Sequence, residues 1–236
     1  MRLDKLLANQ GFGSRKDVKQ LIKKGKVTID GEAVKSSSFH VDPKQSEVIV
    51  NGKTLDYRDY IYIMMNKPKG VISATRDDKE TCVTDLLDEF YTPFSLFPVG
   101  RLDKDTVGLM LITNDGELSH QLLSPKQHVD KVYEAKIKGL VTDADVDAFK
   151  KGVCLEDGYV TKPAKLEILT ADAYSDVRVT ISEGKFHQIK RMFDARGHEV
   201  VELKRLKIGS LVLDHHLDYG EYRELTEEEL KQLQKH

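Results

Sequence analysis

The chain has 236 residues, of which 32% are charged and 39% are hydrophobic, and its formal net charge is −2. A chain of this length can form a hydrophobic core, and it allows either one large domain or one small and one medium domain. No stretch approaches the ~20 apolar residues of a membrane span, and charges interrupt the opening MRLDKLLANQ where a signal peptide would be apolar, so we expect a soluble, cytoplasmic protein.

The first 35 residues predict a small unit of two helices and a hairpin. Leucines between residues 3 and 7 recur at helical spacing. Ser14 and Asp17 have the spacing of a capping box before a second apolar stripe, and Gly25 suits the end of that helix. Two short strand-like pieces then flank 30–31, an Asp-Gly pair that is a strong hairpin signal.

Positive charge is concentrated in this first unit, because the segment up to residue 26 holds eight basic residues and two acids, a net charge of +6. We expect the lysines on the outer face of the second helix, where they either contact RNA phosphates or form a solvated surface. RLDKLLA, SRKDVKQLIKKGKVTIDG and Val34 resemble the S4 RNA-binding domain, which implies a docking module. The candidate RNA-binding residues are Arg2, Lys5, Ser14, Arg15, Lys16, Lys19, Lys23, Lys24 and Lys26.

The chain after this unit mixes strands and helices without regular βαβ alternation, which favours an α+β domain with a largely antiparallel sheet. We place the boundary near residues 57–60, which gives domains 1–59 and 60–236. The predicted strands are YIYIMMNKP, VGLMLIT, KVYEAKI, AKLEILT, DVRVTIS and HEVVELKRLKIGSLVL. The predicted helices are ELSHQLLS, DADVDAFKKG, FHQIKRMFDARG and LTEEELKQL.

Charged residues crowd the loop before one apolar strand, in PVGRLDKDTVGLMLITNDG. A carboxylate there would be ionised at neutral pH, and a nearby cation would keep it so. Such a group could act as a nucleophile or an electrostatic stabiliser. The alternative is a structural turn in which Asp103 and Asp105 bind backbone and Arg101 pairs with one of them. The loop by itself favours this alternative.

Four ordered stretches resemble the RNA pseudouridine synthases. NKPKG at 66–70 is similar to the first motif of that family, and residues 100–116 are similar to the segment that carries the catalytic aspartate in Gly-Arg-Leu-Asp. KVYEAKI at 131–137 is similar to the segment with the active-site tyrosine, and 181–200 to the basic C-terminal motif. The resemblance implies a small S4 (αL-like) domain followed by a mixed, largely antiparallel-sheet pseudouridine synthase catalytic domain.

The resemblance also implies roles for individual residues. Asp103 would be the essential carboxylate, which could add to the ribose C1′, add to the base at C6 or promote glycal formation. Tyr133 would stack on the uracil and could help to remove the C5 proton, with a half-buried strand tyrosine as the alternative for the proton role. Arg101 is expected to help hold the flipped nucleotide. Lys67 and Pro68 are interpreted as fold elements near the cleft.

The helix FHQIKRMFDARG is expected to supply a basic partner for the aspartate. Lys190 stands where many related synthases carry an arginine, and as a lysine it offers a point charge without the bidentate fork. Arg191 is the second candidate for this pairing, and phosphate contact or solvent exposure is the alternative for both. Phe186, Ile189 and Phe193 are expected to define the buried face of the helix, with Ile189 at the floor of the uracil pocket.

No cofactor is expected, because the isomerisation of uridine needs neither a redox change nor an energy input. No spacing of His, Cys and carboxylates supports a metal site. Cys82 and Cys154 lie far apart without a CxxC partner, and His128 and His187 stand alone.

Within this family the chain resembles the small-subunit pseudouridine synthase A branch, through GRLDKDTVGL with TNDG, TKPAKLEIL and the ending GEYRELTEEEL. The branch implies a uridine of 16S ribosomal RNA as substrate, at the uridine-516 site, in free RNA or in a partly assembled small-subunit particle. We expect a monomer with no membrane partner. The alternatives are a 23S ribosomal RNA synthase of the same superfamily, a non-catalytic RNA-binding ribosome-assembly factor, and a metal-dependent nuclease using Asp103, Asp105 and Asp115.

Overall fold

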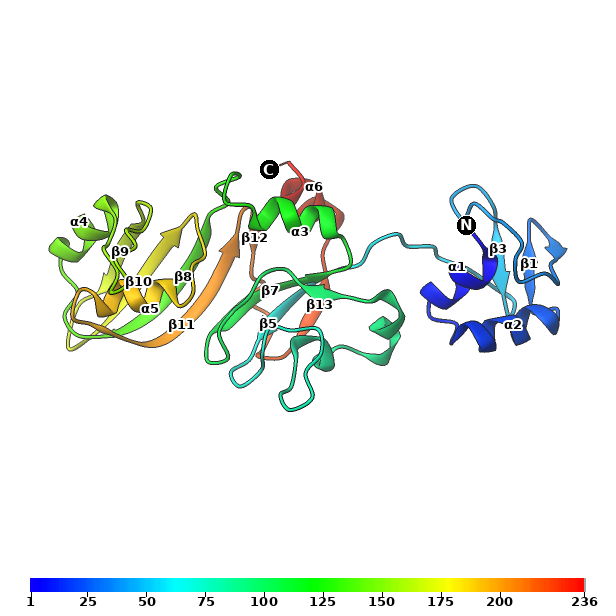
Figure 1. Cartoon of the computed structure of the whole chain (residues 1–236), viewed down its shortest axis with the longest axis horizontal. Coiled ribbons are helices and arrows are strands. Elements are labelled where there is room, and N and C mark those ends of the chain that lie inside the picture. Colours follow the sequence, from blue (N-terminus) through cyan, green and yellow to red (C-terminus); the bar gives the residue numbers. More distant parts are fainter. Residues whose placement is uncertain (236) are drawn as a thin grey trace. The chain divides into compact units, whose positions relative to one another are not determined.

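The computed structural model describes residues 1–235, which fall into two units. The first unit contains Met1–Ile61 together with Leu87–Leu96, and the second contains Tyr62–Leu86 and the chain from Phe97 onward. Figure 1 colours them along the sequence, from blue in the first unit to red at the C-terminus. No helix in the described part of the chain is long and apolar enough to cross a membrane.

Two helices and a four-stranded antiparallel sheet make up most of the first unit. The helices are α1 (Leu3–Asn9) and α2 (Arg15–Lys23), and the sheet has the order β2-β1-β3-β4, with β1 (Val27–Ile29), β2 (Glu32–Ala33), β3 (Val48–Val50) and β4 (Lys53–Thr54). The 3-10 helix η2 (Glu89–Phe94) also belongs to this unit. The capping box at Ser14 and the hairpin between β1 and β2 confirm the two local predictions.

The second unit is built on a nine-stranded sheet with four helices and one 3-10 helix. The sheet order is β13-β5-β7-β11-β8-β10-β9, with β12 on β11 and β6 on β7. Its strands are β5 (Tyr62–Lys67), β6 (Phe97–Pro98), β7 (Val107–Thr113), β8 (Lys131–Lys138), β9 (Lys165–Thr170), β10 (Tyr174–Ile181), β11 (Glu199–Ile208), β12 (Leu211–Val212) and β13 (Tyr222–Glu224). The other elements are η1 (Val83–Leu86), α3 (Gly116–Leu123), α4 (Asp143–Lys151), α5 (Gln188–Asp194) and α6 (Glu227–Leu233).

The strand pairings confirm the predicted mixed, largely antiparallel sheet. β7 and β11 run parallel, and every other strand pair in the described sheet is antiparallel. β7 is buried at all seven positions, whereas β8 and β10 alternate between buried and half-buried residues. This alternation gives β8 and β10 one face toward the core and one toward an open surface. α4 and α5 lie beside β8–β11, and α3 lies beside β7 (Figure 1).

One predicted buried residue is wrong. Phe186 was expected on the buried face of the basic helix, but its side chain is 72% exposed. The helix begins only at Gln188, because His187 adopts a left-handed conformation with φ of 49°. Phe186 therefore precedes the helix and stacks on the His187 ring, with 3.7 Å between the ring centroids. Ile189 and Phe193 are buried as predicted.

Candidate active site

The predicted catalytic residues meet in one hollow of the second unit. The loop between β6 and β7 supplies Asp103, the middle of the sheet supplies Tyr133 from β8, and the first turn of α5 supplies Lys190. Arg101 and Ile189 line the same hollow. Residues that lie up to 89 positions apart in the sequence (101 to 190) therefore share one surface.

Asp103 is held between two side chains from the start of α5. Lys190 Nζ lies 3.2 Å from Asp103 Oδ2, and His187 Nε2 lies 3.3 Å from Asp103 Oδ1. The carboxylate is still 28% exposed, so it can be reached from outside. His187 was expected to stand alone and was not among the predicted site residues; its place three residues before Lys190 in the basic motif was the signal available.

Lys190 also binds Asp105, and this second contact fixes its protonation state. Lys190 Nζ donates to both carboxylate oxygens of Asp105, at 2.7 and 2.9 Å. Burial lowers the pKa of Lys190, but the hydrogen bond to Asp105 and the charge of Asp103 outweigh burial and raise it. The hydrogen bond from Lys190 in turn lowers the pKa of Asp105. The cation beside Asp103 thus stays charged at neutral pH.

The NKPKG motif holds the loop that carries Asp103. Lys67 is fully buried, and its Nζ donates to the carbonyls of Thr106 at 2.8 Å, Pro68 at 3.0 Å and Lys104 at 3.4 Å. The Gly70 amide adds a hydrogen bond of 2.8 Å to the Lys104 carbonyl. Burial lowers the pKa of Lys67 to about 8. These contacts agree with the interpretation of Lys67 as a fold element, because its ammonium binds loop backbone.

Ser73 holds the same loop from its other side. Its Oγ donates to the Leu102 carbonyl and accepts from the Leu102 amide, both at 2.9 Å. The Thr106 amide donates to the Asp103 carbonyl at 3.0 Å, which closes the loop on itself. A site of this kind needs side chains held within about 0.5 Å of the productive geometry, and backbone bonds on both sides provide that restraint.

Tyr133 projects from the buried face of β8, directly opposite Arg205 on β11. The residue is only 8% exposed. No other group in residues 1–235 forms a hydrogen bond with its hydroxyl. The ring therefore forms part of the wall, and the phenol is available to a bound substrate.

Ile189 and Arg191 leave α5 in different directions. Ile189 is 3% exposed and lines the hollow, and its role as a pocket floor stays a prediction. Arg191 instead pairs with Asp157 and donates to the Phe186 carbonyl at 3.3 Å. The cation beside Asp103 comes from Lys190, and Arg191 does not line the hollow.

Most of the predicted RNA-binding residues of the first unit are exposed cations that form no salt bridge within the described chain. They are Lys5, Arg15, Lys16, Lys19, Lys23, Lys24 and Lys26. Two predicted members differ. Arg2 pairs with Asp4, at 2.9 Å between Nη2 and Oδ2, and Ser14 uses its hydroxyl in the capping box of α2.

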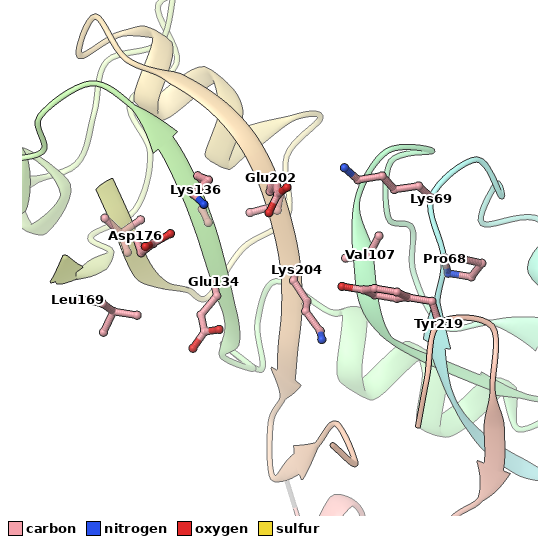
Figure 2. A pocket seen from close by; sticks show the side chains of 13 residues that line it. Pro68, Lys69, Val107, Glu134, Lys136, Leu169, Asp176, Glu202, Lys204 and Tyr219 are labelled. Atoms are coloured by element: carbon pink, nitrogen blue, oxygen red, sulfur yellow. The ribbon is translucent and has the colours of Figure 1, made fainter. Parts of the chain in front are cut away.

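A larger hollow of about 550 Å³ lies on the opposite, open face of the sheet (Figure 2). Its lining includes Glu134, Asp176 and Glu202 together with three lysines. The carboxylates and the ammonium groups are equal in number there, so this surface offers no net attraction to an RNA backbone.

The described chain also gathers one group of metal-ligand side chains that the sequence analysis did not single out, Asp214, His215 and His216. Both histidines are exposed. Asp214 already accepts hydrogen bonds from Arg223 Nε at 2.8 Å and from the His216 amide at 3.0 Å. These contacts account for the group as a surface ion network.

Comparison with known proteins agrees with this geometry. Residues 61–195 match the family model for RNA pseudouridylate synthase, and residues 1–46 match the model for the S4 domain. An uncharacterized RNA pseudouridine synthase, YtzG of Bacillus subtilis (strain 168), is 56% identical over 98% of this chain and 97% of its own length. A crystal structure of a pseudouridylate synthase superposes with a TM-score of 0.69 at 39% identity, covering 99% of both chains.

Two further relatives have named ribosomal substrates. Ribosomal small subunit pseudouridine synthase A of Escherichia coli (strain K12) is 42% identical over 98% of both chains. Ribosomal large subunit pseudouridine synthase B of Bacillus subtilis (strain 168) is 41% identical over 98% of this chain and 95% of its own. Similarity of this extent, together with the aspartate, tyrosine and lysine in one hollow, establishes that the chain belongs to the RNA pseudouridine synthase family, as an isomerase with an N-terminal S4 domain.

Proposed function

We propose that this enzyme converts a uridine of 16S ribosomal RNA, at the uridine-516 site, to pseudouridine, acting as a cytoplasmic monomer on the RNA or on a partly assembled small-subunit particle. The reaction breaks the N1–C1′ bond, rotates the uracil and joins C5 to C1′. The C5 proton is lost and N1 regains one, so atoms balance without a redox step. The observation that carries the proposal is the Lys190–Asp103 ion pair beside Tyr133 in a hollow open to substrate.

Each residue of the hollow has its own role toward the target nucleotide. The target nucleotide leaves its stack, which costs a few kcal/mol unless it is already unpaired. Its uracil lies over Ile189 and against the Tyr133 ring, and Asp103 meets the sugar or the base. Lys190 and His187 hold the carboxylate in place, so no reorientation is needed when charge moves in the reaction.

The first unit contributes RNA affinity. Lys5 on α1, and Arg15 with the exposed lysines on and just after α2, can contact phosphates without reading sequence. This binding offsets the cost of everting the nucleotide. We assign to Arg101, which lines the hollow, the role of holding the everted nucleotide.

Tritium release tests the reaction and its catalytic residue. RNA containing C5-tritiated uridine is incubated with the wild type and with Asp103→Asn, in the presence of EDTA. Release by the wild type alone is expected. Equal release by both proteins would remove Asp103 from its role, and a requirement for Mg²⁺ with strand cleavage would identify a nuclease instead.

A second substrate is supported by the 41% identity to ribosomal large subunit pseudouridine synthase B. The two substrates are separated by offering 16S RNA, partly assembled small-subunit particles and 23S RNA in parallel. Pseudouridine is then mapped by carbodiimide modification and primer extension. Product at the 16S site alone is expected, and product only in 23S RNA would replace the proposed substrate.

A further inference from the structure

A second hollow of about 510 Å³ adjoins the one that holds Asp103. The two share Arg101, Tyr133, Gly184 and Lys185 in their walls. The basic side chains that line this second hollow are Arg101, Lys131, Lys162, Lys185 and Arg205. We call it the basic hollow. It lies on the same face of the sheet as Tyr133, because Lys131 is two residues before Tyr133 on β8.

Two of its cations are buried without a salt-bridge partner in the described chain. Lys131 is 9% exposed and Arg205 is 3% exposed, and neither forms a salt bridge within residues 1–235. Lys131 Nζ donates to the Val129 carbonyl at 3.0 Å. Burial lowers the pKa of Lys131, the charge of Arg205 lowers it further, and the charge of Asp130 only partly opposes this. Unpaired buried charge is unfavourable, so an anion brought to this place would be strongly stabilised.

Arg205 has an unused donor. Its Nε donates to the Leu109 carbonyl at 2.8 Å, which ties β11 to β7. Its Nη2 is buried and has no hydrogen-bond partner in the described chain. The large majority of buried side-chain polar atoms in proteins find partners. The strand contact therefore accounts for Nε, and Nη2 stays a buried donor whose positive charge is not offset by a hydrogen-bond acceptor in the described chain.

The carboxylate in the lining is already satisfied. Glu183 accepts hydrogen bonds from Tyr159 Oη at 2.7 Å, the Lys162 amide at 2.8 Å and Gln188 Nε2 at 2.9 Å. None of these donors is a cationic group of the basic hollow. Glu183 is the one acidic residue among the described residues that line the hollow, and five lining residues are cationic. The hollow therefore keeps a strong net positive charge.

We propose that the basic hollow binds a backbone phosphate of the RNA, one that flanks the nucleoside held at Asp103. This inference rests on the proposed function. A phosphate offers acceptor oxygens only, which match ammonium and guanidinium donors. It is bonded to the same ribose that reacts, so it must lie beside the hollow that holds the sugar. The cross-strand pair of Tyr133 and Arg205 fixes the base and phosphate positions in one rigid frame.

Uridine 5′-monophosphate and uridine, compared as ligands of the full chain, test the site. Binding is followed by NMR shifts of the Tyr133 and Arg205 amides, so phosphate bound at the lysines of the first unit does not interfere. In the wild type the monophosphate is expected to bind about tenfold tighter than uridine, the order of a charge-assisted hydrogen bond. In Lys131→Met this ratio is expected to fall to about one.

Lys136→Met is the matched control, because Lys136 lies on the same strand but lines the hollow on the open face. The ratio should stay at its wild-type value there. Lys162→Gln, at a half-exposed position, should lower the ratio even if Lys131→Met does not fold. An unchanged ratio in both lysine variants, or no shift at Tyr133 and Arg205 with millimolar monophosphate, overturns the site. Neither readout needs turnover, so failure of the tritium assay would be a separate result.

Discussion

Replacement of Lys190 by methionine removes the charge beside Asp103 and keeps most of the side-chain volume. Nζ and Oδ2 are 3.2 Å apart, and the two side chains are 21% and 28% exposed. At this distance an effective dielectric constant of ~20 gives about 5 kcal/mol of attraction. Partial exposure screens the pair, and removal of one partner from a largely buried pair costs about 3 kcal/mol. If this stabilisation acts on the reacting carboxylate, kcat falls about a hundredfold.

Single-turnover tritium release, with RNA binding measured separately by filter retention, checks this prediction. The loss should appear in kcat, with KM nearly unchanged, because Lys190 contacts the carboxylate and does not dock the RNA. Lys190→Arg should restore most of the rate, since a guanidinium can also reach both aspartates. A kcat within threefold of wild type for Lys190→Met, or a loss found entirely in KM, would refute the role of the ion pair.

Three further predictions concern the frame and the rim of the site. The pKa of Lys67 is about 8 in the folded state, against a reference value of 10.5 for the unfolded chain. Between these values the unfolded state binds more protons than the folded state, so the free energy of unfolding rises with pH. Urea unfolding should therefore show that the wild type gains about 2 kcal/mol of stability over Lys67→Met from pH 8 to 9.5. A Cβ at Gly108, where φ is 102°, would lie 2.2 Å from the Arg205 carbonyl oxygen, so Gly108→Ala should lower Tm by many degrees. Gly116→Ala is the control, because a Cβ there meets open space and should leave Tm unchanged. Equal Tm values for the two variants would contradict this prediction. Phe186→Ser should weaken RNA binding about tenfold without changing Tm, because a 72% exposed ring contributes stacking and little core; unchanged affinity would remove the ring from the RNA surface.

The strands and helices were predictable wherever burial produces a regular pattern of apolar residues along the sequence. The seven buried positions of β7 stand out as an apolar run, and the alternation in β8 shows which of its residues face the core. β13 was not predicted, since its three residues are half-buried and largely polar, and its pairing with β5 comes from the tertiary structure. The position of Phe186 was wrong for a local reason, the left-handed residue that follows it.

The sequence was enough to predict which residues form the site, but it was less informative about which of their side chains touch one another. The motifs named Asp103, Tyr133 and Lys190, and the fold brings them together. The contact between His187 and Asp103 depends on the backbone turn that starts α5, which no periodicity reveals. The burial of Arg205 depends on the register between β8 and β11, a relation between strands that are distant in the sequence.

Strand register also sorts charge between the two faces of the second unit's sheet, in a chain whose net charge is only −2. On β8 the odd positions put Lys131 and Tyr133 on the face of the basic hollow, and the even positions put Glu134 and Lys136 on the open face, where charges balance. A slip of one residue would exchange the two faces. Because the field that acts on a phosphate is local, the proposed phosphate site depends on this sorting of charge between the two faces and not on the total charge of the chain.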